Sequence, residues 1–222
     1  MTIDKYANRR EAGKSVATYL KAYAKHPGVQ VLALPRGGVP VAYEIAKALS
    51  APLDILIIRK LGVPGHEELA FGAIAGGGVI VFNEALLKTL SLSEQDIHRV
   101  IQVEQEELQR RETTYRGNKP FPTLKNKVVI LVDDGIATGA TMRAAIQALK
   151  QQQPKRLIVA VPVAARSTID ELSPLVDEII CPLQPEAFYA VGAWYQAFPQ
   201  TTDEEVLGLL QSGEIPAKSA RG

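Results

Sequence analysis

Residues 128–142 read VVILVDDGIATGATM, which places a strand, a loop and the start of a helix in immediate succession. Residues 128–132 are all apolar and mostly β-branched, which is typical of a parallel strand that is buried on both faces. This run ends at Asp133 and Asp134, and a loop with glycine and threonine residues follows. From Ala140 onward the apolar residues have helical spacing. The segment therefore predicts two carboxylates at the carboxyl end of a core strand.

The loop after this strand has the features of an anion site. Free backbone N–H groups at residues 138–142 and the positive end of a helix dipole attract a phosphate. Gly139 lets the backbone approach the anion, while Thr138 and Thr141 add hydroxyl donors. The pattern matches neither a Walker P-loop nor the dinucleotide-binding glycine fingerprint. Two acids before a phosphate cradle can accept hydrogen bonds from vicinal hydroxyls, so a ribose 5-phosphate fits the arrangement.

The same segment resembles the phosphoribosyl pyrophosphate (PRPP) signature of type I phosphoribosyltransferases. The resemblance implies that Asp133 and Asp134 bind the ribose hydroxyls. It also implies a 5-phosphate loop made of Ala137, Thr138, Gly139, Ala140 and Thr141. The alternative is an Asp-Asp surface turn that closes an ordinary buried strand.

A second glycine turn follows the predicted strand 29–34. Pro35 and Arg36 precede Gly37 and Gly38, and a helix is predicted from 39 to 49. Ligands of open α/β folds bind at the edge where such turns lie. The resemblance implies that Arg36, Gly37 and Gly38 form a pyrophosphate loop. The alternative is a plain βα turn with an exposed arginine.

A third candidate loop follows the predicted strand 53–58. Arg59 and Lys60 precede a segment rich in glycine and proline, residues 61–65, which resembles the start of the family's flexible catalytic loop. The resemblance implies that Lys60 and Arg59 are catalytic together with the acid pair, that they contact the pyrophosphate, and that the loop closes over it to exclude water. The alternative is a solvated basic pair at a strand end.

The segment between the two core halves is expected to form a lid. Runs 71–75 and 79–82 flank three glycines and predict a hairpin that belongs to the lid rather than to the parallel core. Ser93 is expected to cap a helix that extends to about Tyr115. Three roles stay open for this helix: simple packing, a cover for the active site, or a dimer surface.

The remaining pattern completes an α/β fold. Strands are predicted at 156–162 and 177–181, and their alternation with helices favours a doubly wound, mostly parallel sheet over a barrel. We expect a single domain over residues 1–222, with its core at about 27–58 and 127–181, a lid insertion at about 59–118 and a small C-terminal hood at about 182–211.

Aromatic residues gather in the predicted hood. Phe188, Tyr189 and Tyr195 are candidates for binding a planar base, because a base stacks on an aromatic ring. The alternative is that these rings pack the hood's own small core.

Composition limits the classes of function. The sequence has 46% hydrophobic and 22% charged residues and a net charge of +1, which gives no electrostatic case for binding nucleic acid or an anionic membrane. Its single cysteine, Cys181, fits a reducing compartment. The N-terminus lacks an apolar signal region, and no apolar run approaches the length of a membrane helix, about 20 residues. We therefore expect a cytoplasmic protein.

The resemblance implies a phosphoribosyltransferase that uses PRPP and magnesium to phosphoribosylate a nitrogenous base or small amine, with release of pyrophosphate. Magnesium would be held mostly by PRPP, with Asp133 and Asp134 as indirect contacts. Many 6-oxopurine enzymes of the family have an aspartate where this chain has Ala137, and over most of its length the sequence looks more like stand-alone members of unassigned acceptor. A non-catalytic PRPP- or nucleotide-sensing regulator is the alternative, and a homodimer stays open.

Overall fold

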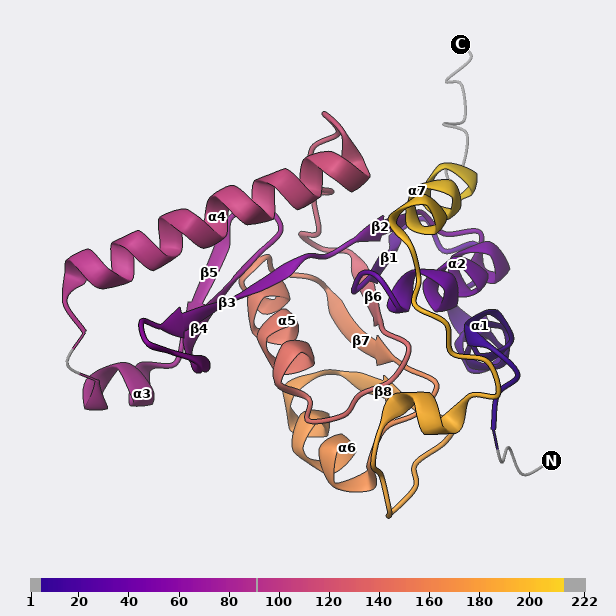
Figure 1. Cartoon of the computed structure of the whole chain (residues 1–222). Helices are drawn as coiled ribbons and strands as arrows, with labels where there is room; N and C mark the ends of the chain where they lie inside the picture. The colour runs from indigo at the N-terminus through magenta and orange to yellow at the C-terminus, as the bar shows by residue number, and fades with distance from the viewer. Residues whose placement is uncertain (1–4, 91, 214–222) are drawn as a thin grey trace, which may run out of the picture.

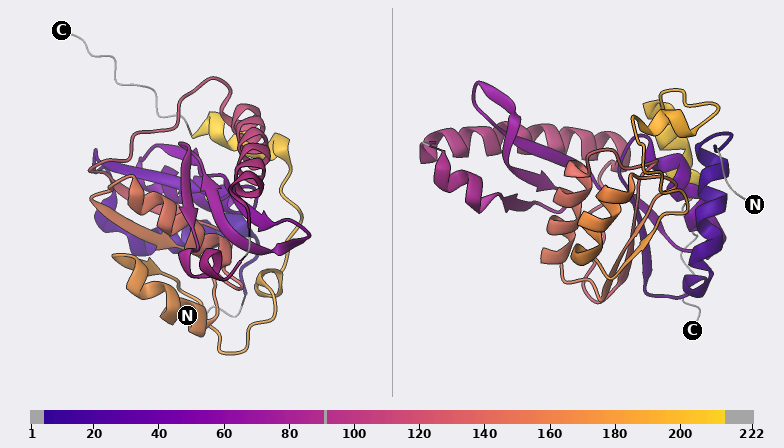
Figure 2. Two further views of the ribbon diagram at one scale, coloured as in Figure 1. Left: turned by 90° about the vertical axis from the view of Figure 1, so that its left-hand side faces the viewer. Right: turned by 90° about the horizontal axis from the view of Figure 1, so that it is seen from below.

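The structure is a computed structural model that describes residues 5–90 and 92–213. Its main sheet contains five parallel strands in the order β2-β1-β6-β7-β8. The strands of this sheet are β1 (Val29–Ala33), β2 (Leu53–Ile55), β6 (Val128–Val132), β7 (Arg156–Ala160) and β8 (Glu178–Ile180). The predicted doubly wound parallel sheet is confirmed, because helices cover both of its faces (Figure 1, Figure 2).

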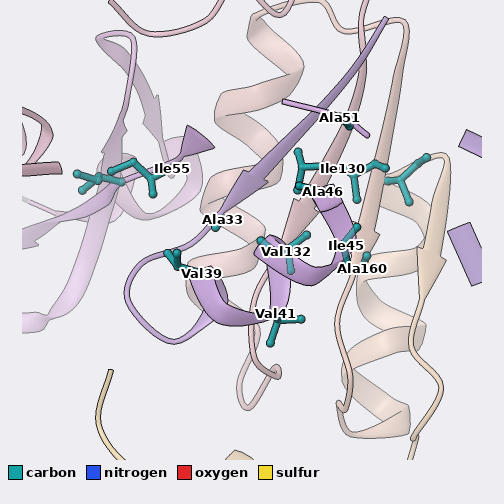
Figure 3. Packing of buried hydrophobic residues seen from close by; sticks show 14 of the residues in the cluster. Ala33, Val39, Val41, Ile45, Ala46, Ala51, Ile55, Ile130, Val132 and Ala160 are labelled. Atoms are coloured by element: carbon teal, nitrogen blue, oxygen red, sulfur yellow. The ribbon is translucent and has the colours of Figure 1, made fainter. Parts of the chain in front are cut away.

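One face of the sheet packs against helices from the beginning and end of the chain. These are α1 (Arg9–Ala17), its 3₁₀ continuation η1 (Thr18–Tyr23), α2 (Gly38–Leu49) and α7 (Asp203–Ser212). Ile45, Ile130 and Val132 lie at the centre of this core, where Figure 3 shows helix α2 against the sheet. Burial of such branched side chains contributes about 1.5–3 kcal/mol each.

The other face is covered by helices from the middle of the chain. These are α5 (Ala140–Gln151), α6 (Arg166–Leu172) and the short 3₁₀ turn η2 (Ser173–Leu175). Met142, Ile146 and Leu149 form the buried stripe of α5, as their helical spacing predicts. None of the helices in the described part of the chain is both long and apolar enough to cross a membrane.

A second, antiparallel sheet projects from the core (Figure 1). It has the order β3-β4-β5. Its strands are β3 (Ile58–Val63), β4 (His66–Ala75) and β5 (Val79–Phe82). The predicted strand 53–58 is therefore wrong in extent, because β2 ends at Ile55 and Ile58 already belongs to the second sheet.

The predicted flexible loop after Lys60 is also wrong. Residues 58–63 form β3, which pairs with β4 across a turn at Pro64 and Gly65. Leu61 and Val63 are buried while their neighbours are more exposed, so the alternation of a half-buried strand outweighs the glycine and proline content. The predicted hairpin 71–75/79–82 is confirmed, and it lies outside the parallel core.

Two helices complete the projecting lid: α3 (Glu84–Thr89) and α4 (Glu94–Arg116). Helix α4 begins where expected, and the Ser93 hydroxyl accepts a hydrogen bond from the Asp96 N–H at 3.1 Å. This helix packs along β3 and β4 and reaches α7 of the main body with its C-terminal part (Figure 1). It therefore connects the lid to the edge of the core.

The predicted hood is mostly irregular. Between β8 and α7 the chain forms one 3₁₀ turn, η3 (Val191–Trp194), and packs against Tyr6 near the N-terminus. Helix α7 begins after Thr202, whose hydroxyl accepts a hydrogen bond from the Glu205 N–H at 3.1 Å.

Candidate functional site

The two glycine-containing loops of the core lie against each other at the carboxyl edge of the sheet. A Cβ atom on Gly37 would lie 2.1 Å from Asp134 Oδ2, and one on Gly38 would lie 2.8 Å from the Val132 carbonyl oxygen. Neither position has room for a side chain. The Leu34 N–H also donates to the Val132 carbonyl oxygen at 2.9 Å. The loop at 35–38, in which the Pro35–Arg36 peptide bond is cis, and the acid pair therefore form one continuous surface.

The loop at 137–141 presents an open helix N-terminus. Gly139 is the N-cap of α5 with φ of +76°, a conformation that favours glycine, and it has no side chain to cover the first helical turn. Thr138 and Thr141 are exposed beside it. The Thr168 hydroxyl donates to the Ala137 carbonyl oxygen at 3.1 Å and holds the loop from outside. Backbone N–H groups, two hydroxyls and the helix dipole can thus meet an anion here.

The acid pair is held in a poorly solvated environment. Asp133 Oδ1 accepts from the Asp134 N–H at 2.8 Å. Burial raises the pKa of Asp133 well above its ordinary value, and the neighbouring Asp134 charge raises it further. Burial also raises the pKa of Asp134, but Arg9 opposes that rise. Two carboxylates close together, one of them stabilised by an arginine, can accept hydrogen bonds from a pair of hydroxyls.

Arg9 is a site residue that the sequence analysis missed. Its Nε donates to Asp134 Oδ2 at 2.7 Å, and its Nη1 donates to the Pro199 carbonyl oxygen at 2.6 Å. The guanidinium also lies 3.7 Å from the centroid of the Phe198 ring. Arg9 therefore ties the N-terminal helix and the hood to the acid pair, and no local sequence pattern connects positions that are so far apart along the chain.

The structure contradicts the predicted role of Tyr195 as a base-binding residue. Its ring is only 4% exposed and packs against Tyr6 and Phe198, with centroid distances of 5.8 and 4.9 Å. Its hydroxyl donates to the Asp134 carbonyl oxygen at 2.5 Å. The ring is therefore not available to stack on a base and instead positions the backbone of the acid pair.

The other two aromatic candidates differ from each other. Phe188 is half-buried and stacks on Trp194 with a centroid distance of 6.4 Å and an interplanar angle of 19°, which supports the alternative that the hood packs its own core. Tyr189 is 93% exposed. Contact of either ring with a base stays a prediction.

A cavity of about 310 Å³ opens beside the loop at 35–38. Its polar wall contains Arg36 and Thr141 from the two core loops, Asp203 from α7, and three residues from the end of α4, Arg110, Arg111 and Tyr115. Helix α4, whose role the sequence left open, therefore lines the candidate site.

Arg59 and Lys60 do not lie with these groups. Arg59 Nε donates to Glu104 Oε2 of α4 at 2.7 Å. Lys60 is exposed and lines a separate pocket of about 370 Å³ that also contains Glu104. Among the described residues that line the cavity at Arg36, neither cation is present. Their catalytic role stays a prediction, and the structure does not bring them to the glycine loops.

The acid pair fits a magnesium ion that is held mainly by a bound ligand. Within residues 5–90 and 92–213, no three His, Cys, Asp or Glu side chains gather in a way that could hold a metal. Magnesium prefers oxygen ligands and commonly uses one or two carboxylates plus substrate phosphates. Asp133 and Asp134 supply the carboxylates, so the phosphates would have to supply most of the remaining ligands.

Comparisons with known proteins identify the family of the chain. Residues 4–191 match the family model described as "Phosphoribosyl transferase domain". A Mycobacterium tuberculosis protein named "Putative phosphoribosyl transferase MT0597" is 42% identical over 205 residues, which cover 92% of this chain and 46% of that protein. The chain thus spans about half the length of the curated relatives that it matches.

Solved structures show the same fold. The crystal structure of TT1426 from Thermus thermophilus has a TM-score of 0.83 and 38% identity, with 94% of this chain and 98% of that chain covered. The AQ2163 protein from Aquifex aeolicus has a TM-score of 0.50 and 13% identity, with 83% and 78% covered, a likeness of fold alone. By the extent of the family match and the identity to these relatives, the chain belongs to the phosphoribosyltransferase family.

Proposed function

We propose that this protein is a phosphoribosyltransferase that binds PRPP with magnesium and transfers the 5-phosphoribosyl group to a nitrogenous base or small amine. The observation that carries the proposal is the contact between the two core loops. The glycines at 37 and 38 lie directly on Asp133 and Asp134, next to the open N-terminus of α5.

The loop at 137–141 is the proposed site for the 5-phosphate. The backbone N–H groups of Ala140 and Thr141, two exposed residues in the first turn of α5, and the Thr138 and Thr141 hydroxyls supply donors at the positive end of this helix. The adjacent carboxylates of Asp133 and Asp134 would accept hydrogen bonds from the ribose 2′- and 3′-hydroxyls. This arrangement would bring the anomeric carbon near the loop at 35–38.

The loop at 35–38 is the proposed site for the pyrophosphate. Gly37 is half-buried, and Arg36 lines the adjoining cavity. Gly38 is buried and its N–H donates to the Leu34 carbonyl oxygen at 3.1 Å, so it lets the loop pack closely on the acid pair. In the reaction the bond from the anomeric carbon to a pyrophosphate oxygen breaks, and its electron pair leaves with the pyrophosphate. The acceptor nitrogen forms the new bond and loses a proton. Magnesium, when bound with PRPP, supplies positive charge that neutralises the phosphates.

The acid pair also contributes to the charge balance of this step. Positive charge that develops on the ribose during glycosyl transfer is stabilised by nearby carboxylates. Arg9 orients the Asp134 carboxylate and opposes the burial-driven rise of its pKa, and the Tyr195 hydroxyl donates to the Asp134 backbone carbonyl. These two residues are positioning residues, because they act through Asp134.

The second candidate is a non-catalytic PRPP-sensing protein, and one observation favours it. Lys60 and Arg59, the cations expected to stabilise the leaving group, lie outside the cavity at Arg36. A protein that binds PRPP without turning it over would not need those cations there.

The experiment that tests the proposal is a turnover assay with the full chain, PRPP, magnesium and a panel of purines, pyrimidines and small amines. The proposal predicts pyrophosphate release that depends on one class of acceptor. PRPP binding without acceptor-dependent release from any member of the panel would refute the enzyme and support the sensor.

A further inference from the structure

We propose that Arg110 and Arg111, near the C-terminal end of lid helix α4, bind the pyrophosphate end of PRPP together with Arg36, and that Asp203 occupies this site until the ligand arrives. The inference rests on the proposed function, since it assigns pyrophosphate binding to further residues of the same site. It concerns a helix to which the sequence analysis gave no definite role.

The first observation is the position of the two arginines. Both line the cavity of about 310 Å³ that is also lined by Arg36 and Thr141. Thr141 belongs to the proposed 5-phosphate loop and Arg36 to the proposed pyrophosphate loop. A ligand with phosphates at both ends, bound across these loops, therefore has the end of α4 as its neighbour on the pyrophosphate side.

The second observation is that both guanidinium groups keep free donors. Arg110 uses Nε and Nη2 to contact Glu107 at 2.7 and 2.9 Å, and Arg111 uses only Nε to contact the same carboxylate at 2.7 Å. A guanidinium carries five N–H donors, so several from each arginine remain for a phosphate. The side chains are 67% and 44% exposed, so a ligand can reach them.

The third observation is the charge balance around Glu107. One carboxylate is shared by two arginines, and their hydrogen bonds lower the pKa of Glu107 to about 2. The three residues together therefore carry one excess positive charge. Pyrophosphate is multiply charged, and a single arginine at position 36 is a small counter-charge for it.

Asp203 supplies the fourth observation. Its Oδ1 lies 3.6 Å from Arg36 Nη1 and accepts a hydrogen bond from the Tyr115 hydroxyl at 2.5 Å. Burial raises the pKa of Tyr115 to about 12, and its hydrogen bond to Asp203 raises it as well. A carboxylate thus stands at the arginine that the pyrophosphate needs, so the two anions compete for one cation.

The test compares affinities for two ligands by calorimetric titration in the presence of magnesium. PRPP carries the pyrophosphate, and ribose 5-phosphate lacks it. Arg110→Ala/Arg111→Ala should weaken PRPP binding about tenfold or more, because charged hydrogen bonds to the ligand are lost, while ribose 5-phosphate affinity stays within about twofold. Arg99→Ala is the matched control, since Arg99 lies on the same helix and pairs with Asp96 at the same i,i+3 spacing.

The opposite variant separates this account from general damage to the structure. Asp203→Asn should tighten PRPP binding several-fold, because it removes the competing charge and leaves the Thr202 cap of α7 intact. If the substitutions acted only by distorting the site, both Arg110→Ala/Arg111→Ala and Asp203→Asn would weaken PRPP binding. Unchanged PRPP affinity in the double arginine variant, or equal losses for PRPP and ribose 5-phosphate, would overturn the inference alone, because acceptor-dependent pyrophosphate release by the wild type tests the proposed function separately. Failure of the wild type to bind PRPP would overturn both.

Discussion

Replacement of Arg9 by alanine should destabilise the fold in a strongly pH-dependent way. Arg9 and Asp134 form an ion pair at 2.7 Å in which the two side chains are only 10% and 14% exposed. Removal of the arginine leaves a buried carboxylate without its counter-charge. Loss of one partner of a buried pair costs about 3–5 kcal/mol.

Protonation of Asp134 sets a ceiling on that cost. The free energy needed to protonate an aspartate with an ordinary pKa near 4 is about 4 kcal/mol at pH 7 and about 1–2 kcal/mol at pH 5. The folded protein can protonate the unpaired carboxylate instead of burying its charge, so the destabilisation cannot exceed these values. The unpaired carboxyl has a raised pKa in the folded state, so its destabilising effect is present above that pKa and disappears as the pH falls through it. The loss in Arg9→Ala should therefore be about 3–4 kcal/mol at pH 7 and smaller by roughly half at pH 5.

Urea unfolding at the two pH values measures this difference. Asp134→Asn in the Arg9→Ala background should recover most of the loss, because no charge then remains to be buried. Arg143→Ala is the control: its pair with Glu171 at 2.9 Å is largely exposed, so it should cost less than about 1 kcal/mol at both pH values. A loss below about 1 kcal/mol for Arg9→Ala, or an equal loss at both pH values, would refute the electrostatic reasoning.

Three further variants test the site itself. Gly37→Ala should reduce PRPP affinity about tenfold or more in a titration, because the new Cβ would lie 2.1 Å from Asp134 Oδ2; unchanged affinity would show that the two loops need not touch. Asp133→Asn should raise the free energy of unfolding at pH 7 by about 1–2 kcal/mol while it abolishes PRPP binding, since it removes a buried charge. That gain should vanish as the pH falls through the raised pKa of Asp133, and a loss of stability in denaturant unfolding would contradict the expectation. Lys60→Ala should weaken PRPP binding less than Arg36→Ala, because Arg36 lines the cavity beside the glycine loops and Lys60 lines a different pocket. A larger loss for Lys60→Ala in parallel titrations would show that Lys60 belongs to the PRPP site.

The parallel core was predictable because its signals are local. The buried run 128–132 and the acid and glycine pattern after it contain both the strand and the loop within a few positions, and β6 and α5 form there as expected. The second sheet was harder to predict from the sequence. Residues 53–58 form one mostly apolar run, and only the pairing of Ile58 with Ala75 shows that the chain has changed sheets.

The part of the site that could not be predicted from the sequence depends on contacts between segments that are far apart along the chain. Arg9 lies 125 positions from Asp134, so its role depends on how α1 packs against α2. Arg110 and Arg111 read as ordinary surface residues of a charged helix, and only the placement of α4 over the core brings them to the same cavity as Arg36. Tyr195 was selected as an aromatic ring, but its burial between Tyr6 and Phe198 makes it a support for the acid pair.

The central claim is that the glycine loop and the acid pair form one PRPP site. Its most direct test is calorimetric titration of magnesium and PRPP into the wild type and into Asp133→Asn/Asp134→Asn, with folding of the variant checked by circular dichroism. The account predicts binding to the wild type and loss of binding by a variant that remains folded. Equal affinity in the two proteins, or no binding by the wild type, would contradict it.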